Sequence, residues 1–260
     1  MSSTCENIFI TGASRGIGAA LSQFYAKPGV SLGLLSKGAE DLETVAARCR
    51  KKGAAVYTYV GDVADAEHVA RCASDFQSHV ECVDLVIANA GIRLEDAEYL
   101  DTSIPARIME VNYLGVVHTI LPFIANMKRR GSGHLVAISS IGAYRGTPNS
   151  GAYAASKGAV NLWTEGLRLS LKPHGICVST LCSGFVRTDM TKDLNFWMPG
   201  LLSPEEAAGI IASAIRRRKR LVTFPWKVKI IWTLFRVLPG PMYDRLILWA
   251  KGRIDKGKWL

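Results

Sequence analysis

One glycine-rich stretch near the N-terminus reads Thr11-Gly12-Ala13-Ser14-Arg15-Gly16-Ile17-Gly18. It follows a short apolar run at residues 7–10, which is typical of a buried strand, and it precedes a helical pattern at residues 16–26. The glycines let the backbone turn tightly and approach a ligand, and a helix N-terminus offers free N–H groups to a pyrophosphate. The spacing of the glycines is Gly-x-x-x-Gly-x-Gly. Glycines also occur in turns that bind nothing, but their position between a strand and a helix favours a dinucleotide-binding site.

Apolar runs and helical patterns alternate along the chain beyond this loop. Strands are predicted at residues 7–10, 31–35, 56–60, 85–88, 134–138, 177–182 and 221–224. Helices are predicted at residues 16–26, 40–52, 66–78, 106–130, 153–172 and 203–217, and Pro122 is expected to bend the longest of them. Strict alternation of this kind implies right-handed crossovers and a sheet covered on both faces. We therefore predict an α/β fold, a Rossmann-type doubly wound parallel sheet of about seven strands in the order 3-2-1-4-5-6-7.

Composition is that of one large globular domain. Of the 260 residues, 48% are hydrophobic and 21% are charged, which is enough for a sizeable core. The six cysteines form no Cys-x-x-Cys pair and suit neither a zinc site nor a disulfide framework, so no metal and a reducing, cytoplasmic compartment are expected. The N-terminal residues 1–7 do not resemble a signal peptide. We expect a catalytic domain over residues 1–225 and a C-terminal helical extension over residues 226–260.

The choice of nucleotide depends on the end of the second predicted strand. NAD-binding folds place a carboxylate there for the ribose hydroxyls, whereas a basic residue suits the 2′-phosphate of NADP. This chain has Ser36 and Lys37 at that point, and Arg15 lies in the glycine loop. Either cation alone is equally well explained as a solvated surface residue. Together, without the carboxylate, they favour NADP(H) as the cofactor.

Tyr153 and Lys157 are four residues apart, which places them on one face of a predicted helix. An ammonium group near a tyrosine favours the tyrosinate and lowers the pKa of the phenol, so the pair suits proton transfer. A Tyr and a Lys at this spacing are common on helix surfaces, so a catalytic role for the pair depends on the other residues predicted to lie near it. Ser140 follows the fifth strand, and residues 89–91 (Asn-Ala-Gly) end the fourth at the same edge of the sheet. Asn112 lies in the long predicted helix, and its side-chain amide is expected to hydrogen-bond either a water molecule or a backbone carbonyl.

These motifs, in this order, resemble the classical branch of the short-chain dehydrogenase/reductase family over about residues 5–225. The resemblance implies that Tyr153 is the general acid/base, that Lys157 binds the nicotinamide ribose and tunes Tyr153, and that Ser140 polarises the substrate oxygen. It also implies that Asn112 anchors a proton-relay water. The cofactor-binding residues expected from the loop and the resemblance are Gly12, Ser14, Arg15, Gly16, Ile17, Gly18, Ser36, Lys37, Asp62, Val63, Asn89, Ala90, Gly91, Tyr153, Lys157, Gly184, Val186 and Thr188.

The implied reaction is hydride transfer between the nicotinamide and a carbonyl carbon, with reduction of a ketone or aldehyde as the expected direction. One departure from the family pattern is Ser183-Gly184, where Pro-Gly is usual, with Cys182 before it. The missing proline either has no effect on the site or makes the backbone at the nicotinamide end of the predicted cofactor site less rigid. We interpret Cys182 as a small buried residue and not as a reactive thiol. A catalytically silent nucleotide sensor or scaffold is the alternative from another class, and the complete set of catalytic residues argues against it.

The loop after the sixth strand is expected to select the substrate. Ser140 and Tyr153 would contact the reacting oxygen, and the loop adds an apolar lining from Met190, Leu194, Phe196 and Trp197. A hydrophobic, lipid-like or steroid-like carbonyl compound follows as the leading hypothesis, with a 3-oxoacyl thioester as the alternative. The alternative is that these apolar side chains pack beneath the loop and do not contact a substrate.

The C-terminal end is distinctly basic. Residues 203–260 hold 13 Lys and Arg against 4 Asp and Glu, out of a net charge of +10 for the chain. Two apolar stretches with tryptophans, residues 224–239 and 242–250, are too short and too interrupted to cross a membrane. They predict either an anchor on an anionic membrane surface or an oligomer interface or lid over the cleft. Nucleic acid is not an expected partner, and a homodimer or homotetramer is expected from the resemblance alone.

Overall fold

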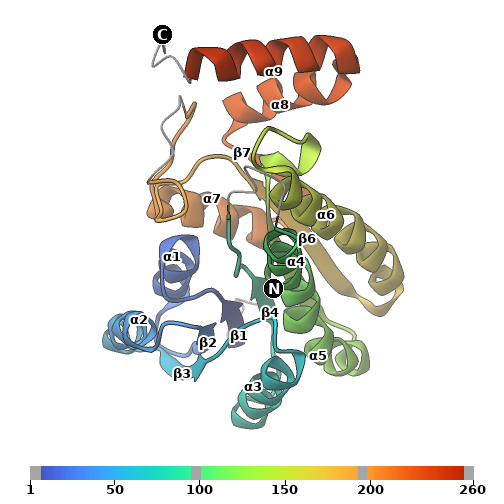
Figure 1. Cartoon of the computed structure of the whole chain (residues 1–260). Helices are drawn as coiled ribbons and strands as arrows, with labels where there is room; N and C mark the ends of the chain where they lie inside the picture. The colour runs from blue at the N-terminus through green and yellow to red at the C-terminus, as the bar shows by residue number, and fades with distance from the viewer. Residues whose placement is uncertain (1–6, 95–100, 193–197, 255–260) are drawn as a thin grey trace.

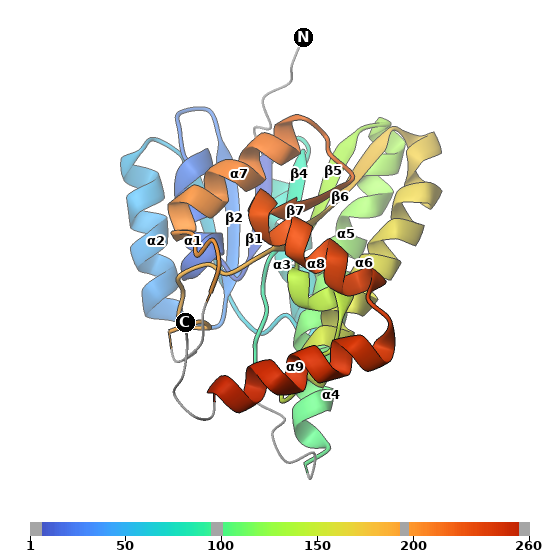
Figure 2. The ribbon, with the colours of Figure 1, turned by 90° about the horizontal axis from the view of Figure 1, so that it is seen from above.

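The computed structural model describes residues 7–94, 101–192 and 198–254. Within these ranges the strands form one parallel sheet with the order β3-β2-β1-β4-β5-β6-β7, which confirms the predicted fold class. Figures 1 and 2 show the sheet between two layers of helices. The strands are β1 (Asn7–Thr11), β2 (Ser31–Ser36), β3 (Ala55–Val60), β4 (Leu85–Ala88), β5 (Gly133–Ser140), β6 (Ile176–Ser183) and β7 (Leu221–Phe224).

Alternation of side chains along the strands builds two apolar cores, one on each face of the sheet. Ile8 and Ile10 of β1 point into the core beneath one helical layer, whereas Phe9 packs on Phe76 and Phe123 in the other core. The first layer consists of α1 (Gly16–Tyr25), α2 (Ala39–Lys51) and α7 (Pro204–Arg216), and the second of α3 (Ala66–His79), α4 (Ser103–Met109), α5 (Gly115–Arg130) and α6 (Gly151–Leu171).

The longest predicted helix differs from the expectation. It begins at Ser103, and a π-helical turn, Glu110–Leu114, divides α4 from α5. Pro122 lies inside α5, which continues through it to Arg130, so the interruption falls where Asn112 turns inward and not at the proline. A π-helical turn inserts one extra residue, and such turns are frequent at functional sites.

The span from Ser103 to Arg130 is long and apolar enough to cross a membrane by length and composition alone. Its inner face nevertheless packs into the protein core, where Ile120, Phe123 and Met127 are almost completely buried. We therefore interpret it as a core helix.

The last two helices, α8 (Trp226–Val237) and α9 (Gly240–Ile254), lie together at one end of the molecule (Figure 1). They pack on the segment after β5, which includes the 3₁₀ turn η2 (Ile141–Tyr144). The Tyr243 hydroxyl donates to the Gly146 carbonyl at 2.6 Å, and the Arg145 guanidinium lies 4.6 Å above the Tyr243 ring. Residues 226–254 are thus held against the rest of the described fold.

Candidate active site

A cleft of about 1080 Å³ opens at the carboxyl ends of the strands. It spans the point between β1 and β4 where the strand order reverses, which is where open α/β sheets bind their ligands. Leu194, Phe196 and Trp197 lie outside the described residues, and neither Gly18 nor Asn112 lines the cleft. The other residues predicted from the sequence line it together: Gly12, Ser14, Arg15, Gly16, Ile17, Ser36, Lys37, Asp62, Val63, Asn89, Ala90, Gly91, Ser140, Tyr153, Lys157, Gly184, Val186, Thr188 and Met190.

The glycine loop is held closely against the end of β4. Gly12 has a φ of +68°, and a Cβ on Gly18 would lie 2.0 Å from the Gly12 carbonyl oxygen. The Asn89 amide donates to the Thr11 and Gly12 carbonyls, each at 3.1 Å. Asn89 therefore fixes the turn, and the turn presents the N-terminus of α1 to the cleft, where a dinucleotide pyrophosphate fits.

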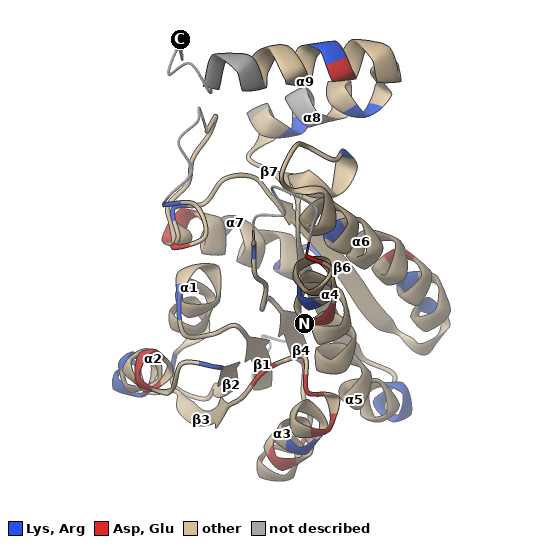
Figure 3. Cartoon of the chain, viewed as in Figure 1, with Lys and Arg blue, Asp and Glu red and all other residues tan. Residues whose placement is uncertain are grey.

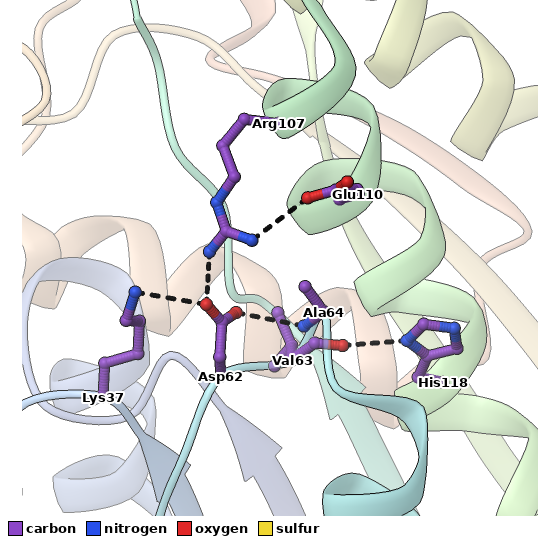
Figure 4. A network of polar contacts seen from close by, with 7 residues as sticks. All are labelled: Lys37, Asp62, Val63, Ala64, Arg107, Glu110 and His118. Atoms are coloured by element: carbon purple, nitrogen blue, oxygen red, sulfur yellow. Dashed lines mark hydrogen bonds and ion pairs between the residues drawn. The ribbon is translucent and has the colours of Figure 1, made fainter. Parts of the chain in front are cut away.

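The end of the cleft beside β2 carries more charge than the sequence suggested. Lys37 Nζ lies 3.1 Å from Asp62 Oδ2, and Arg107 of α4 forms an ion pair with the same oxygen (Figure 4). Burial by itself raises the pKa of Asp62, but the Ala64 N–H and the two cations outweigh it and hold that pKa below its ordinary value. Asp62 is therefore an anion between two cations.

Arg15 and Ser36, the other residues predicted to select the cofactor, also have partners. Arg15 Nη1 lies 2.7 Å from Asp189 Oδ2, and its Nε lies 3.5 Å from Asp41 Oδ2. The Ser36 hydroxyl lies 2.7 Å from the Ser14 hydroxyl. Both arginine pairs are largely exposed, and exposed ion pairs contribute little stability, so a phosphate can compete for Arg15 at small cost.

Three residues predicted to be catalytic, Ser140, Tyr153 and Lys157, converge at the other end of the cleft. Lys157 is 5% exposed, and its Nζ donates to the Ile138 carbonyl at 3.2 Å and lies 6.0 Å from the centre of the Tyr153 ring. Burial lowers the pKa of Lys157 to about 8. The Ser140 hydroxyl accepts a hydrogen bond from the Gly142 N–H at 3.1 Å and faces the Tyr153 hydroxyl.

The state of Tyr153 corrects one expectation. The sequence predicted that Lys157 lowers the pKa of the phenol, but burial dominates in the structure and raises it. A hydrogen bond with Ser140 and the charge of Arg93 act in the opposite direction and are weaker. Tyr153 is consequently a protonated phenol at neutral pH, which suits a proton donor.

Asn112 is completely buried in the π-helical turn, and protein groups engage its amide. Its Oδ1 accepts from the Ile92 N–H at 2.8 Å, and its Nδ2 donates to the Ile92 carbonyl at 2.9 Å and to the Ser156 hydroxyl at 3.1 Å. These contacts hold the backbone after β4 against α6, one turn from Tyr153. The role of Asn112 in anchoring a water stays a prediction.

The departure at Ser183 leaves the strand intact. Ser183 ends β6, and its hydroxyl donates to the Ser139 carbonyl of β5 at 3.3 Å. Cys182 is fully buried, and burial raises the pKa of its thiol, so the structure agrees with the interpretation as a small buried residue and not as a reactive thiolate.

The cleft wall also includes residues that were not predicted as site residues from the sequence, among them three arginines and two residues of α9. Arg93 donates to the Ser150 hydroxyl at 3.0 Å near Tyr153, and Arg107 faces Asp62. Arg145, which follows η2, lines the same cleft, as do Ile247 and Ala250 of α9. Of these five, Arg93 carried a local signal, because it follows the Asn-Ala-Gly sequence by two positions, whereas the other four depend on how distant segments of the chain pack.

Comparison with known proteins agrees with this geometry. Residues 6–199 match the family model described as short chain dehydrogenase. An uncharacterized oxidoreductase of Myxococcus xanthus is 30% identical over 236 residues, which cover 90% of this chain and 93% of that protein.

Two solved structures have the same fold. An alcohol dehydrogenase from the archaeon Thermococcus sibiricus, complexed with 5-hydroxy-NADP, is 27% identical with a TM-score of 0.75, and the match covers 84% of this chain and 95% of that one. A short chain dehydrogenase/reductase from Burkholderia phymatum, in complex with NAD, is 24% identical with a TM-score of 0.82, covering 90% and 94% of the two chains. The chain therefore belongs to the short-chain dehydrogenase/reductase family of oxidoreductases.

Proposed function

We propose that this protein is an NADP(H)-dependent reductase that interconverts a ketone or aldehyde and the corresponding alcohol on a hydrophobic, lipid-like or steroid-like substrate. The observation that carries the proposal is the meeting of Ser140, Tyr153 and Lys157 at one end of a cleft whose other end holds the glycine loop.

The chain's own groups supply the proton transfer. Tyr153, protonated at neutral pH, donates its proton to the oxygen of the developing alkoxide, and Ser140 holds that oxygen by a hydrogen bond. Lys157, cationic and buried beside the ring, stabilises the tyrosinate that remains. The bound nicotinamide would supply the hydride.

The preference for NADP(H) over NAD(H) is supported by the groups at the β2 end of the cleft. Ser36 stands where a carboxylate would hold the ribose hydroxyls, and Arg15 and Lys37 line the wall beside it. The negative charge of Asp62 is offset by Lys37 and Arg107, which reduces its repulsion of a 2′-phosphate. The carboxylates around Arg15 work against the preference, so a direct comparison of NADPH with NADH is the test.

An apolar substrate is supported by the wall beyond Tyr153. Ile92, Ile141 and Phe185 line it from the catalytic domain, and Ile247 lines it from α9. A 3-oxoacyl thioester remains the alternative substrate class. A homodimer or homotetramer also remains an expectation, consistent with the exposed Leu121 of α5 and with Leu162 and Leu169 of α6.

The test is NADPH oxidation across ketones of increasing chain length, with NADH as the control, for the natural protein and for Tyr153→Phe. We expect faster turnover with NADPH and with longer ketones, and a loss of about a hundredfold or more in Tyr153→Phe. NADPH binding to that variant, measured by calorimetry, should be unchanged because the hydroxyl alone is removed. Undiminished turnover in Tyr153→Phe would overturn the assignment, and NADPH binding without turnover of any substrate by the natural protein would favour a sensor.

A further inference from the structure

The outer face of α8 is an apolar stripe. Trp226, Ile230, Leu234 and Val237 recur at spacings of three and four residues and are 66%, 53%, 58% and 73% exposed. Val228, on the opposite side of the helix, is completely buried against the domain. The exposed face of α8 in the monomer therefore carries tryptophan and aliphatic side chains, whereas the exposed face of a surface helix is usually polar.

The outer face of α9 continues this pattern. Met242, Leu246 and Trp249 are spaced by four and three residues and are 57%, 37% and 57% exposed. The inner face of the same helix contributes Ile247 and Ala250 to the wall of the catalytic cleft. One helix thus separates the cleft from the exterior, with apolar side chains on both of its sides.

Cations flank both stripes. Lys229 and Arg236 of α8 and Arg245 of α9 are exposed and lie beside the apolar positions on a helical projection. Figure 3 shows Lys and Arg on both helices. In the sequence, residues 226–260 hold 8 Lys and Arg against 2 Asp and Glu. The basic run 216–220, by contrast, precedes β7, so a strand's length separates it from the α8 stripe.

Hydrogen bonds tie the helical pair to the segment after β5. Arg145 Nε donates to the Phe235 carbonyl at 3.1 Å, and its guanidinium also binds the Leu238 carbonyl near the end of α8. Tyr243 is 7% exposed and, through its hydroxyl, is tied to Gly146. The stripes therefore lie on helices that are packed and hydrogen-bonded against the rest of the fold.

We propose that the outer faces of α8 and α9 form a docking surface for an anionic lipid bilayer, and that apolar substrate enters the cleft from that bilayer past α9. Indole and aliphatic side chains flanked by Lys and Arg match the boundary between acyl chains and anionic headgroups. A second copy of this chain fits the surface less well, because it would bring together two surfaces that both carry a net positive charge. The entry of substrate rests on the proposed function, whereas the docking does not.

The first test measures docking without turnover. The full-length protein is sedimented with phosphatidylcholine vesicles that contain either no phosphatidylglycerol or roughly a third of it. We expect binding to the anionic vesicles that weakens as salt rises, and at least about tenfold weaker binding for Trp226→Ser/Trp249→Ser. The control is Phe24→Ser, which removes an aromatic side chain of similar exposure (55%) from α1, outside the helical pair, and should bind as the natural protein does.

Circular dichroism and NADPH binding establish that each variant is folded. Absence of sedimentation, or equal sedimentation of the double variant, would overturn the docking proposal. A double variant that changes the oligomeric state in analytical ultracentrifugation while sedimenting with vesicles normally would assign the surface to a second copy instead.

The second test concerns substrate entry. A long-chain ketone dissolved in anionic vesicles is compared with a short, water-soluble ketone. The double variant should turn over the vesicle-borne ketone several-fold more slowly and the soluble ketone at the normal rate. Equal rates on the vesicle-borne ketone would refute entry from the bilayer. If neither ketone is reduced by the natural protein, the proposed function fails while the docking result stands.

Discussion

His134 makes the stability of the fold depend on pH in a way that can be calculated from its surroundings. It is 4% exposed in β5, and its Nε2 lies 2.7 Å from the Ser179 hydroxyl. That hydroxyl donates to the Lys219 carbonyl at 2.6 Å, so it accepts the Nε2 proton, which defines the neutral tautomer. Burial, with a smaller contribution from the charge of Arg218, lowers the pKa of His134 from 6.5 to about 4.

The sign of the effect follows from this difference. The unfolded chain takes up a proton at its ordinary pKa, whereas the folded protein resists protonation until about pH 4. The contribution of His134 to stability is therefore complete above the ordinary pKa and is lost as pH falls toward 4. The full loss is about 3 kcal/mol, of which about 2 kcal/mol falls between about pH 7 and about pH 5.

Urea unfolding of the natural protein and of His134→Gln at both pH values isolates this contribution, because a glutamine amide can donate to Ser179 but does not titrate. The variant should lose about 2 kcal/mol less than the natural protein over that interval. His174→Gln, at an exposed position, is the matched control and should follow the natural protein. Equal losses in the natural protein and in His134→Gln would refute the reasoning.

Two further substitutions probe the cleft. Gly18→Ala would place a Cβ 2.0 Å from the Gly12 carbonyl oxygen, so we expect NADPH affinity to fall by about tenfold or more in titration calorimetry. The control is Gly166→Ala in α6, where a Cβ meets open space, so this variant should bind NADPH normally and gain up to about 1 kcal/mol of stability. Normal NADPH binding by Gly18→Ala would contradict the close packing of the loop. Arg93→Gln removes a charge that lowers the pKa of Tyr153, so the pH of half-maximal alcohol oxidation should rise by about one unit or less. A pH profile unchanged from that of Arg48→Gln, an exposed control on α2, would exclude this influence.

The layered fold and many of the cleft-lining residues could be predicted from local sequence patterns. Strand and helix periods are local, and the carboxyl ends of parallel strands meet at one edge, so the sequence already predicts that the glycine loop, Asn89, Ser140 and Tyr153 lie together. The strand order and the family membership were predicted correctly for the same reason.

The partners that the cleft residues face depend on long-range packing. The pKa of Tyr153 depends on burial by α6 and its surroundings, which local spacing does not reveal, and so the expected effect of Lys157 was overestimated. The pairing of Arg107 with Asp62 joins residues 45 positions apart, and the interruption of the long helix occurs at Asn112 because Ile92, from another part of the chain, offers it backbone partners.

The same division applies to the C-terminal residues. Their charge and apolar content were evident from the sequence, but a helical period does not say which face is buried. Packing on Arg145 and Gly146 turns Tyr243 inward, places Ile247 on the cleft and leaves Trp249 exposed. Burial is a property of the whole chain, because each face is chosen by what the neighbouring elements leave uncovered.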